Sequence, residues 1–149
     1  MTTDQGGKMA DTKPKTVHEA MSAAMADVQK IGKDSTNKQQ GFAFRGIDAV
    51  MNAVGPAFRA HGVVVTPQAL GYDATSVTTK GGTEMHHVIV QVRYIFAGPQ
   101  GDTLEAVTYG EAMDAGDKAM SKAHSVSFRT ALLQVLTIPT GDPDPDNDT

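Results

Sequence analysis

The strongest constraint on the fold of this chain is a pair of extended segments on either side of a glycine turn. Residues 69–79 and 84–96 flank Lys80-Gly-Gly-Thr83, and Gly-Gly between two such segments is a strong β-hairpin signal. In the second segment every other residue is apolar, namely Val88, Val90, Val92, Tyr94 and Phe96. Successive strand side chains point to opposite faces of a sheet. One face of this second segment is therefore wholly apolar and must be covered, whereas its other face is mixed.

Two amphipathic segments precede the hairpin. Thr16-Val-His-Glu19 is a capping box that predicts the start of a helix, and Gly32 is expected to follow its last residue. A second helical pattern runs from Ile47 to His61, and Gly62 is predicted to end it. Because Gly55-Pro56 lies inside that pattern, we expect the second helix to kink or to split into two short pieces.

Two further strands complete the predicted sheet. Val63–Thr66 is a short β-branched run, read as a separate buried strand that Pro67 ends. After a turn at residues 99–102, residues 103–109 form another antiparallel strand. The predicted order is α, α, β, β, β, β, α. This order indicates an α+β fold, in which a small antiparallel sheet packs against helices and a long helix comes last.

The two ends of the chain differ from the middle. Residues 1–15 have no periodicity and are predicted to be a disordered arm, residues 16–140 a single domain, and residues 141–149 a disordered acidic tail. The chain has no cysteine, which excludes disulfides and thiolate metal sites. It has no apolar run of the ~20 residues that a membrane span needs. We therefore expect a cytoplasmic protein with no membrane partner.

The last predicted helix, of about five turns, carries a polar stripe at spacings of three and four residues. The stripe consists of Lys118, Ser121, Lys122, Ser125 and Arg129. Cations interleaved with small hydroxyls on one face suit a row of phosphates. The alternative is that these residues are simply the solvated face of the helix.

A second basic segment lies between the first two helices. Residues 33–40 form a polar loop with Lys33 and Lys38, followed by Phe42, Phe44 and Arg45. Phe42 and Phe44 share one side of an extended segment. If that side faces the core, the two rings are core residues. If it faces a groove, they can stack on unpaired bases beside the loop lysines and Arg45.

Two possible sites, a phosphate loop and a magnesium site, have weaker support in the sequence. Gly110 and Gly116 superficially resemble a phosphate loop, but five residues separate them and Asp117 precedes Lys118. Glu111, Asp114 and Asp117 are candidate magnesium ligands, although Asp114 or Asp117 is better explained as the cap of the last helix. The five histidines have no ligand spacing. The sequence thus predicts no catalytic residue, no metal and no cofactor.

Four ordered blocks carry a resemblance to a known family. They are Gly41-Phe-Ala-Phe-Arg-Gly-Ile-Asp-Ala-Val50, His61-Gly-Val-Val-Val-Thr-Pro67, Tyr109-Gly-Glu-Ala-Met-Asp-Ala-Gly-Asp-Lys-Ala119 and Ser125-Val-Ser-Phe-Arg-Thr-Ala-Leu-Leu-Gln134. Over about Val17 to Asp144 the chain resembles the ERF family of phage-type single-strand annealing proteins. The resemblance implies a hairpin-and-helix core shared with other annealing proteins. It also implies ATP-independent binding of single-stranded DNA, pairing of complementary strands, and assembly into rings or filaments.

Together these observations predict a non-enzymatic DNA-annealing protein acting in phage or prophage recombination inside a bacterial host. The expected partners are single-stranded DNA, the annealed duplex, other copies of the chain, and a host or phage single-strand-binding protein. The expected DNA contacts are the five stripe residues with Lys33, Lys38, Phe42, Phe44 and Arg45. The alternative is an α+β adaptor that binds replication or recombination proteins through its sheet. A metal-dependent nuclease is a more distant alternative.

Overall fold

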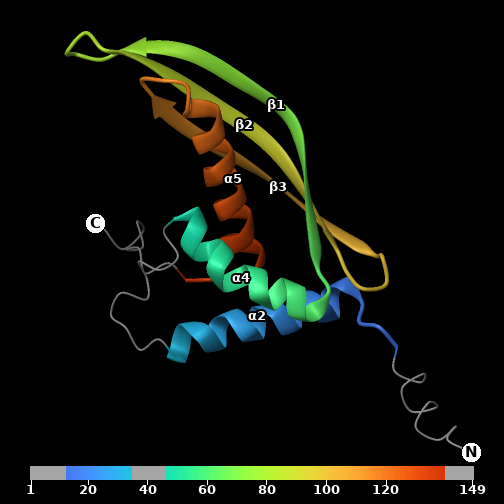
Figure 1. Cartoon of the computed structure of the whole chain (residues 1–149). Helices are drawn as coiled ribbons and strands as arrows, with labels where there is room; N and C mark the ends of the chain where they lie inside the picture. Colours follow the sequence, from blue (N-terminus) through green and yellow to red (C-terminus); the bar gives the residue numbers. More distant parts are fainter. Residues whose placement is uncertain (1–12, 35–45, 140–149) are drawn as a thin grey trace, which may run out of the picture.

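The structure is a computed structural model that describes residues 13–34 and 46–139. The elements in these ranges are α2 (Val17–Asp34), α4 (Ile47–His61), β1 (Val64–Thr78), β2 (Glu84–Ala97), β3 (Thr103–Asp114) and α5 (Ala119–Val135). Figure 1 shows a curved sheet with all three helices on its concave side. The predicted α+β fold, with an antiparallel sheet and a long C-terminal helix, is therefore confirmed.

The sheet is a three-stranded antiparallel meander in the order β1-β2-β3. Its central strand follows the alternation expected from the sequence, because Val88, Val90, Val92, Tyr94 and Phe96 are all buried. The glycine turn also forms as predicted: Thr79 and Thr83 are joined by a backbone hydrogen bond, and Gly82 has a positive φ of 86°. A left-handed conformation of this kind favours glycine.

Two predictions about the strands were wrong. The segments 63–66 and 69–79 are not separate strands, since β1 runs without interruption through Pro67, and Leu70 is accommodated at a register shift. Proline is tolerated there because β1 is an edge strand, where a missing N–H need not break a ladder. The third strand also continues past Tyr109 to Asp114, because residues 110–114 pair with residues 86–90 of β2.

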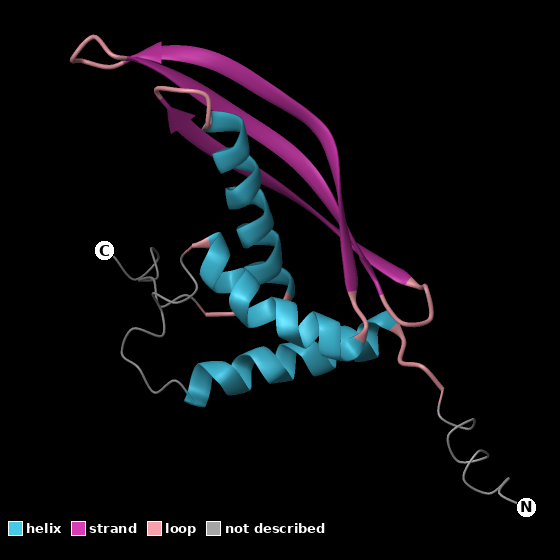
Figure 2. Ribbon diagram, viewed as in Figure 1, coloured by secondary structure: helices cyan, strands magenta, loops and turns pink. Residues whose placement is uncertain are grey.

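The helices cover the sheet unevenly. α5 packs along β3 and β2, while α2 packs mainly on α4 (Figure 2). The core lies between these layers and contains large buried side chains such as Phe58, Phe96 and Leu132. In contrast, every residue from Thr66 to Thr78 of β1 is exposed. The concave face of the sheet is therefore covered at β2 and β3 and open at β1.

The N-terminus of α2 is held by two sets of hydrogen bonds. The capping box forms as predicted: the Thr16 amide donates to Glu19 Oε1 at 2.9 Å, and the Glu19 amide donates to Thr16 Oγ1 at 3.1 Å. These bonds lower the pKa of Glu19 below its ordinary value. Asp102, in the β2–β3 turn, accepts from the Val17 amide at 3.0 and 3.1 Å. The turn and the helix are thereby fixed to each other.

The first helix is longer than predicted, and the second is not split into two pieces. α2 continues through Gly32 to Asp34, so Lys33 belongs to this helix and not to a loop. One glycine near a helix end costs only about 1 kcal/mol, which packing of the helix on α4 can offset. α4 is one helix with Pro56 inside it. Pro56 and Asn52 are both exposed, so the carbonyl group that Pro56 leaves without a donor can bind water. Gly62 ends α4 with φ 72°, as predicted.

Some predictions fall outside the described ranges. Residues 1–12, which form most of the predicted arm, and residues 140–149, which include the predicted tail, are among them. Within the described part of the arm, the Pro14 carbonyl accepts a hydrogen bond from Gln100 Nε2 at 2.7 Å, and Lys15 Nζ lies 3.1 Å from His61 Nδ1. Among the helices in the described ranges, none is long and apolar enough to cross a membrane.

Candidate nucleic-acid interface

The position of α5 is set by unusually close contact with β3. A Cβ atom on Gly110 would lie 2.0 Å from the Ala123 carbonyl oxygen and 2.6 Å from the Ser127 amide nitrogen. Only glycine permits this approach, because any side chain would overlap the helix backbone. The helix surface facing the sheet is correspondingly made of small residues: Ala119, Ala123, Ser127 and Ala131 are buried.

Beneath α5, a buried hydrogen-bond network fixes the rotation of the helix. The Tyr94 hydroxyl donates to Ser127 Oγ at 3.0 Å, and Thr108 Oγ1 donates to the Ser127 carbonyl at 2.8 Å. Burial raises the pKa of the Tyr94 phenol above its ordinary value, so the hydroxyl keeps its proton and remains a donor. The sequence did not identify Ser127 as a buried residue, because serine is mostly an exposed residue type and carries no signal of burial.

With the buried side fixed, the polar stripe faces a groove. Ser121, Lys122, Ser125 and Arg129 line it together with Gly46 and Ile47 at the start of α4. We call this depression, of about 490 Å³, the basic groove. Its charged side chains are Lys122 and Arg129, both cations. The structure thus brings together four predicted contact residues, whereas Lys118 occupies the N-cap of α5 and does not line the groove.

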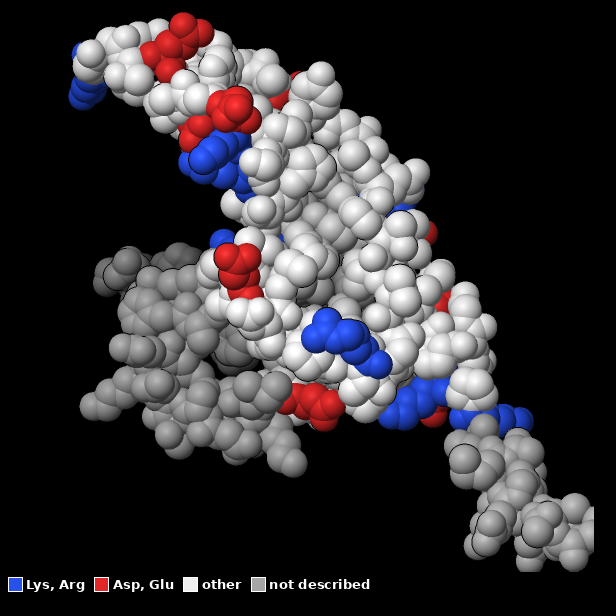
Figure 3. All heavy atoms as spheres, viewed as in Figure 1, with Lys and Arg blue, Asp and Glu red and all other residues white. Residues whose placement is uncertain are grey.

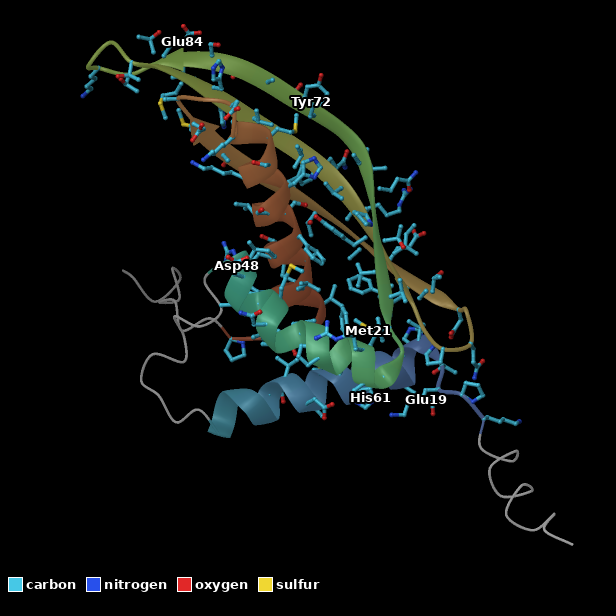
Figure 4. The ribbon with its side chains drawn as sticks, in the orientation of Figure 1. Glu19, Met21, Asp48, His61, Tyr72 and Glu84 are labelled. Atoms are coloured by element: carbon cyan, nitrogen blue, oxygen red, sulfur yellow. The ribbon has the colours of Figure 1, made fainter. Side chains whose placement is uncertain are left out.

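The N-terminus of α4 lies at this groove, because Gly46 and Ile47 line it. Its N-cap is Gly46, which has no side chain to accept from the first amides of the helix. Uncapped amides at a helix N-terminus attract anions. Asp48 in the first turn opposes this attraction, since it places a carboxylate close to those amides. In Figure 3 basic atoms lie on the upper lip of a notch and an acidic group on the lower lip, where Figure 4 labels Asp48.

Asp114, the last residue of β3, forms a salt bridge with one of the two cations, Lys122. Lys122 Nζ lies 2.6 Å from Asp114 Oδ1, and Asp114 Oδ2 accepts from the amides of Gly116 and Lys118 at 2.9 and 3.2 Å. The Lys122 hydrogen bond, followed by those two amides, lowers the pKa of Asp114 to about 2. Lys122 is therefore held in place, and its charge is partly balanced.

The prediction that Asp114 or Asp117 is the N-cap of α5 was wrong. Lys118 is the N-cap residue, and its side chain makes no capping hydrogen bond. Asp114 stabilises the preceding turn instead, since the β3 strand extends far enough to put its carboxylate beneath that turn. An exposed Asp117 forms part of the turn itself.

The three acids suggested as magnesium ligands do not converge. Glu111 Oε2 pairs with His87 Nε2 at 3.0 Å, whereas Asp114 binds Lys122. Glu111 is exposed and Gly110 beside it is buried, which places Glu111 on the face of the sheet away from α5. No group of three or more histidine, aspartate or glutamate side chains suited to a metal is found in the described ranges.

A second groove lies on the other flank of α5. It is lined mainly by apolar groups, including Met51 of α4, Val65 and Pro67 of β1, and Phe128 of α5, and it measures about 450 Å³. We call it the apolar groove. It shares Ile47 and Ser125 with the basic groove. Sequence reasoning missed it, because its walls come from four elements and only the fold brings them together.

The remaining predicted contacts cannot be placed at this site. Lys38, Phe42, Phe44 and Arg45 lie outside the described residues, and Lys33 is placed in α2 by its backbone alone. Arg45 directly precedes Gly46, which lines the basic groove. The chain that leads from this predicted segment into α4 therefore reaches the basic groove at Gly46.

Comparison with known proteins gives one match. The family model of the ERF superfamily matches residues 17–149, which includes all the described elements. No curated protein and no solved structure matches the chain.

Proposed function

Because the chain belongs to the ERF superfamily, we propose that it binds single-stranded DNA through the basic groove and anneals complementary strands without ATP. Membership of the family supports a phage-type role in single-strand annealing and recombination. The observation that carries the proposal is the convergence of Lys122, Arg129, Ser121 and Ser125 on one groove. Cations attract phosphates, and short hydroxyls position them.

The annealing mechanism needs no chemical step by the protein. Cations in the groove reduce the repulsion between two phosphate backbones, and base pairing supplies the driving free energy. A row of protomers would extend one groove into a continuous track, so we propose that the protein works as a ring or filament. Its further partners would be the annealed duplex and a host or phage single-strand-binding protein, in the cytoplasm of a bacterial host.

The predicted contacts beyond the groove belong to the same proposal. Lys118 would add charge at the end of the groove near the N-terminus of α5. Arg45 would add charge where the chain enters α4, with Lys38 on the same connection and Lys33 near the end of α2. Phe42 and Phe44 would support stacked bases there, because an aromatic ring stacks on any base.

Binding and annealing are measured on the whole protein. Labelled complementary oligonucleotides are mixed without ATP, and duplex formation is followed over time. We expect acceleration over the protein-free rate. We also expect Lys122→Ala and Arg129→Ala each to weaken single-strand binding about fivefold, and to reduce the slope of log affinity against log salt by about 0.7.

Matched controls remove the same charges elsewhere. Lys80 lies at the exposed tip of the hairpin, and Arg93 is on the sheet face away from α5, where it pairs with Glu105 at 3.5 Å. Lys80→Ala and Arg93→Ala should leave both the affinity and the salt slope close to the wild-type values. If all four folded variants bind alike, the DNA lies elsewhere on the protein.

A protein-interaction adaptor is the second candidate, and one observation favours it. The sheet face away from α5 exposes Val107, Tyr109 and Met113, with 45%, 63% and 43% of each residue accessible. Exposed apolar residues of this kind can form an interaction surface. An absence of DNA binding by the wild-type protein, even at low salt, would favour the adaptor.

A further inference from the structure

The apolar groove differs from the basic groove in the sign of its charge. Its lining includes one carboxylate, Asp48, and one imidazole, His124, whereas the charged residues of the basic groove are Lys122 and Arg129. A phosphate is attracted to the cations and repelled by Asp48. The two grooves meet at Ile47 and Ser125. A strand whose phosphates lie in the basic groove therefore passes directly beside the apolar one.

The walls of the apolar groove suit a flat, partly polar ring. Phe128 stacks on Tyr94 with their ring centroids 5.1 Å apart and an angle of 20° between the planes, so the two rings form one aromatic block. Met51, which is 49% exposed, and Pro67 add further apolar groups to the lining of the groove. Apolar walls with a few fixed polar groups are typical of small-ligand pockets, and aromatic side chains bind unpaired bases by stacking.

We propose that the apolar groove holds one nucleobase per protomer, taken from the strand whose phosphates occupy the basic groove. Asp48 accepts a hydrogen bond from the exocyclic amino group of that base. Thymine has no such amino group, whereas cytosine donates through its N4 amino group, the usual partner of an aspartate. The groove thus favours cytosine over thymine. The remaining bases stay outside and free to pair.

This inference rests on the proposed function, but its test can fail separately. The readout is the ratio of affinities for oligo-dC and oligo-dT of equal length, measured by fluorescence anisotropy at pH 7.5 and one salt concentration. We expect the wild-type protein to prefer oligo-dC about fivefold, the size of one hydrogen bond to a partly exposed charged group. Phosphate contacts contribute equally to both oligonucleotides, so they cancel in the ratio.

Asp48→Asn is the critical variant. An asparagine amide can donate to the carbonyl oxygen of thymine as well as accept from cytosine, so the ratio should fall to about twofold or less. The loss of one negative charge should strengthen binding to both oligonucleotides equally. Glu84→Gln, at the far end of the sheet (Figure 4), makes the same charge change away from the groove and should keep the wild-type ratio.

A second variant tests the walls of the groove. Met51→Ala shortens an exposed side chain, so the fold should persist. An oligonucleotide with regularly spaced abasic sites should bind the wild-type protein less tightly than the intact strand, and Met51→Ala should reduce that difference.

These outcomes distinguish a failure of the base pocket from a failure of the basic groove. A wild-type ratio of one, or an unchanged ratio in Asp48→Asn, overturns the base pocket while the salt dependence of Lys122→Ala still supports the basic groove. A Met51→Ala protein that changes its mass in solution and keeps the wild-type ratio and abasic difference would show a contact between copies, which also overturns the base pocket. No single-strand binding by the wild-type protein would overturn both proposals.

Discussion

The two sides of α5 have opposite physical characters. On the sheet side, Ala123 and Ser127 approach Gly110 so closely that a single Cβ atom would overlap the helix backbone. On the other side, Lys122 and Arg129 open onto a groove of about 490 Å³. The close side fixes the position and the rotation of the helix. Buried residues on the sheet side of α5 therefore determine the direction in which the proposed phosphate ligands point.

Gly110→Ala tests whether the close contact with β3 fixes α5, and we expect it to have the largest effect. The added methyl group would lie 2.0 Å from the Ala123 carbonyl oxygen, so α5 must move away from β3. Overpacking of this kind costs about 3 kcal/mol, or more when the backbone itself must shift. We expect a loss of about that size in the free energy of unfolding, measured by urea denaturation. DNA affinity should fall as well, since the groove moves with the helix.

Gly116→Ala provides the matched control on the open side. A Cβ at Gly116 would have its nearest neighbour, Asp114 Oδ2, at 3.3 Å in an exposed turn. The same substitution there should change stability by less than about 1 kcal/mol. Equal losses in the two variants would show that glycine at position 110 is not required for packing α5.

The hydrogen-bond network beneath α5 gives the next largest effect. Ser127→Ala leaves the buried Tyr94 hydroxyl without its acceptor, which should cost about 1–3 kcal/mol. Tyr94→Phe removes the donor, so the double variant should be less destabilised than the sum of the two single variants. Strictly additive losses would contradict the coupling. Ser121→Ala, on the polar side, should stay within about 0.5 kcal/mol of wild type.

The features that local sequence patterns predicted are those that depend on near neighbours. The hairpin at Lys80–Thr83, the capping box at Thr16 and the end of α4 at Gly62 each need only a few adjacent residues, and all three are present. The alternation in β2 was readable because burial on one face leaves a period of two in the sequence.

The errors occurred where tertiary context overrides a local signal. Pro67 normally ends a strand, but it is accommodated because β1 lies at the edge of the sheet. Gly32 normally ends a helix, yet α2 continues to Asp34. The sequence favours Asp114 or Asp117 as a helix cap, since nothing local shows that β3 reaches Asp114. Of the site, the spacing of the polar stripe predicted four side chains that line the basic groove. The apolar groove could not be predicted in this way, because its walls come from four separate elements.

The smallest expected effect concerns the salt bridge between Asp114 and Lys122. The pKa of Asp114 is lowered from 3.8 to about 2, chiefly by Lys122. A depressed pKa in the folded state means that this contribution to stability is fully present above pH 3.8 and is lost as the pH falls through about 2. NMR titration of the carboxyl group should give this value, and Lys122→Ala should move it back towards 3.8.

The same pair decides between the two interpretations of the polar stripe. If Lys122 is only a solvated residue that pairs with Asp114, then removing that carboxylate has no consequence for DNA. If Lys122 binds phosphate, Asp114 competes with the DNA for it, and Asp114→Asn should strengthen single-strand binding about twofold and steepen the salt dependence. The asparagine oxygen can still accept from the amides of Gly116 and Lys118, so the turn should persist. Binding and salt slope equal to wild type in a folded Asp114→Asn protein would assign Lys122 to the turn and leave Arg129 as the principal phosphate contact of the basic groove.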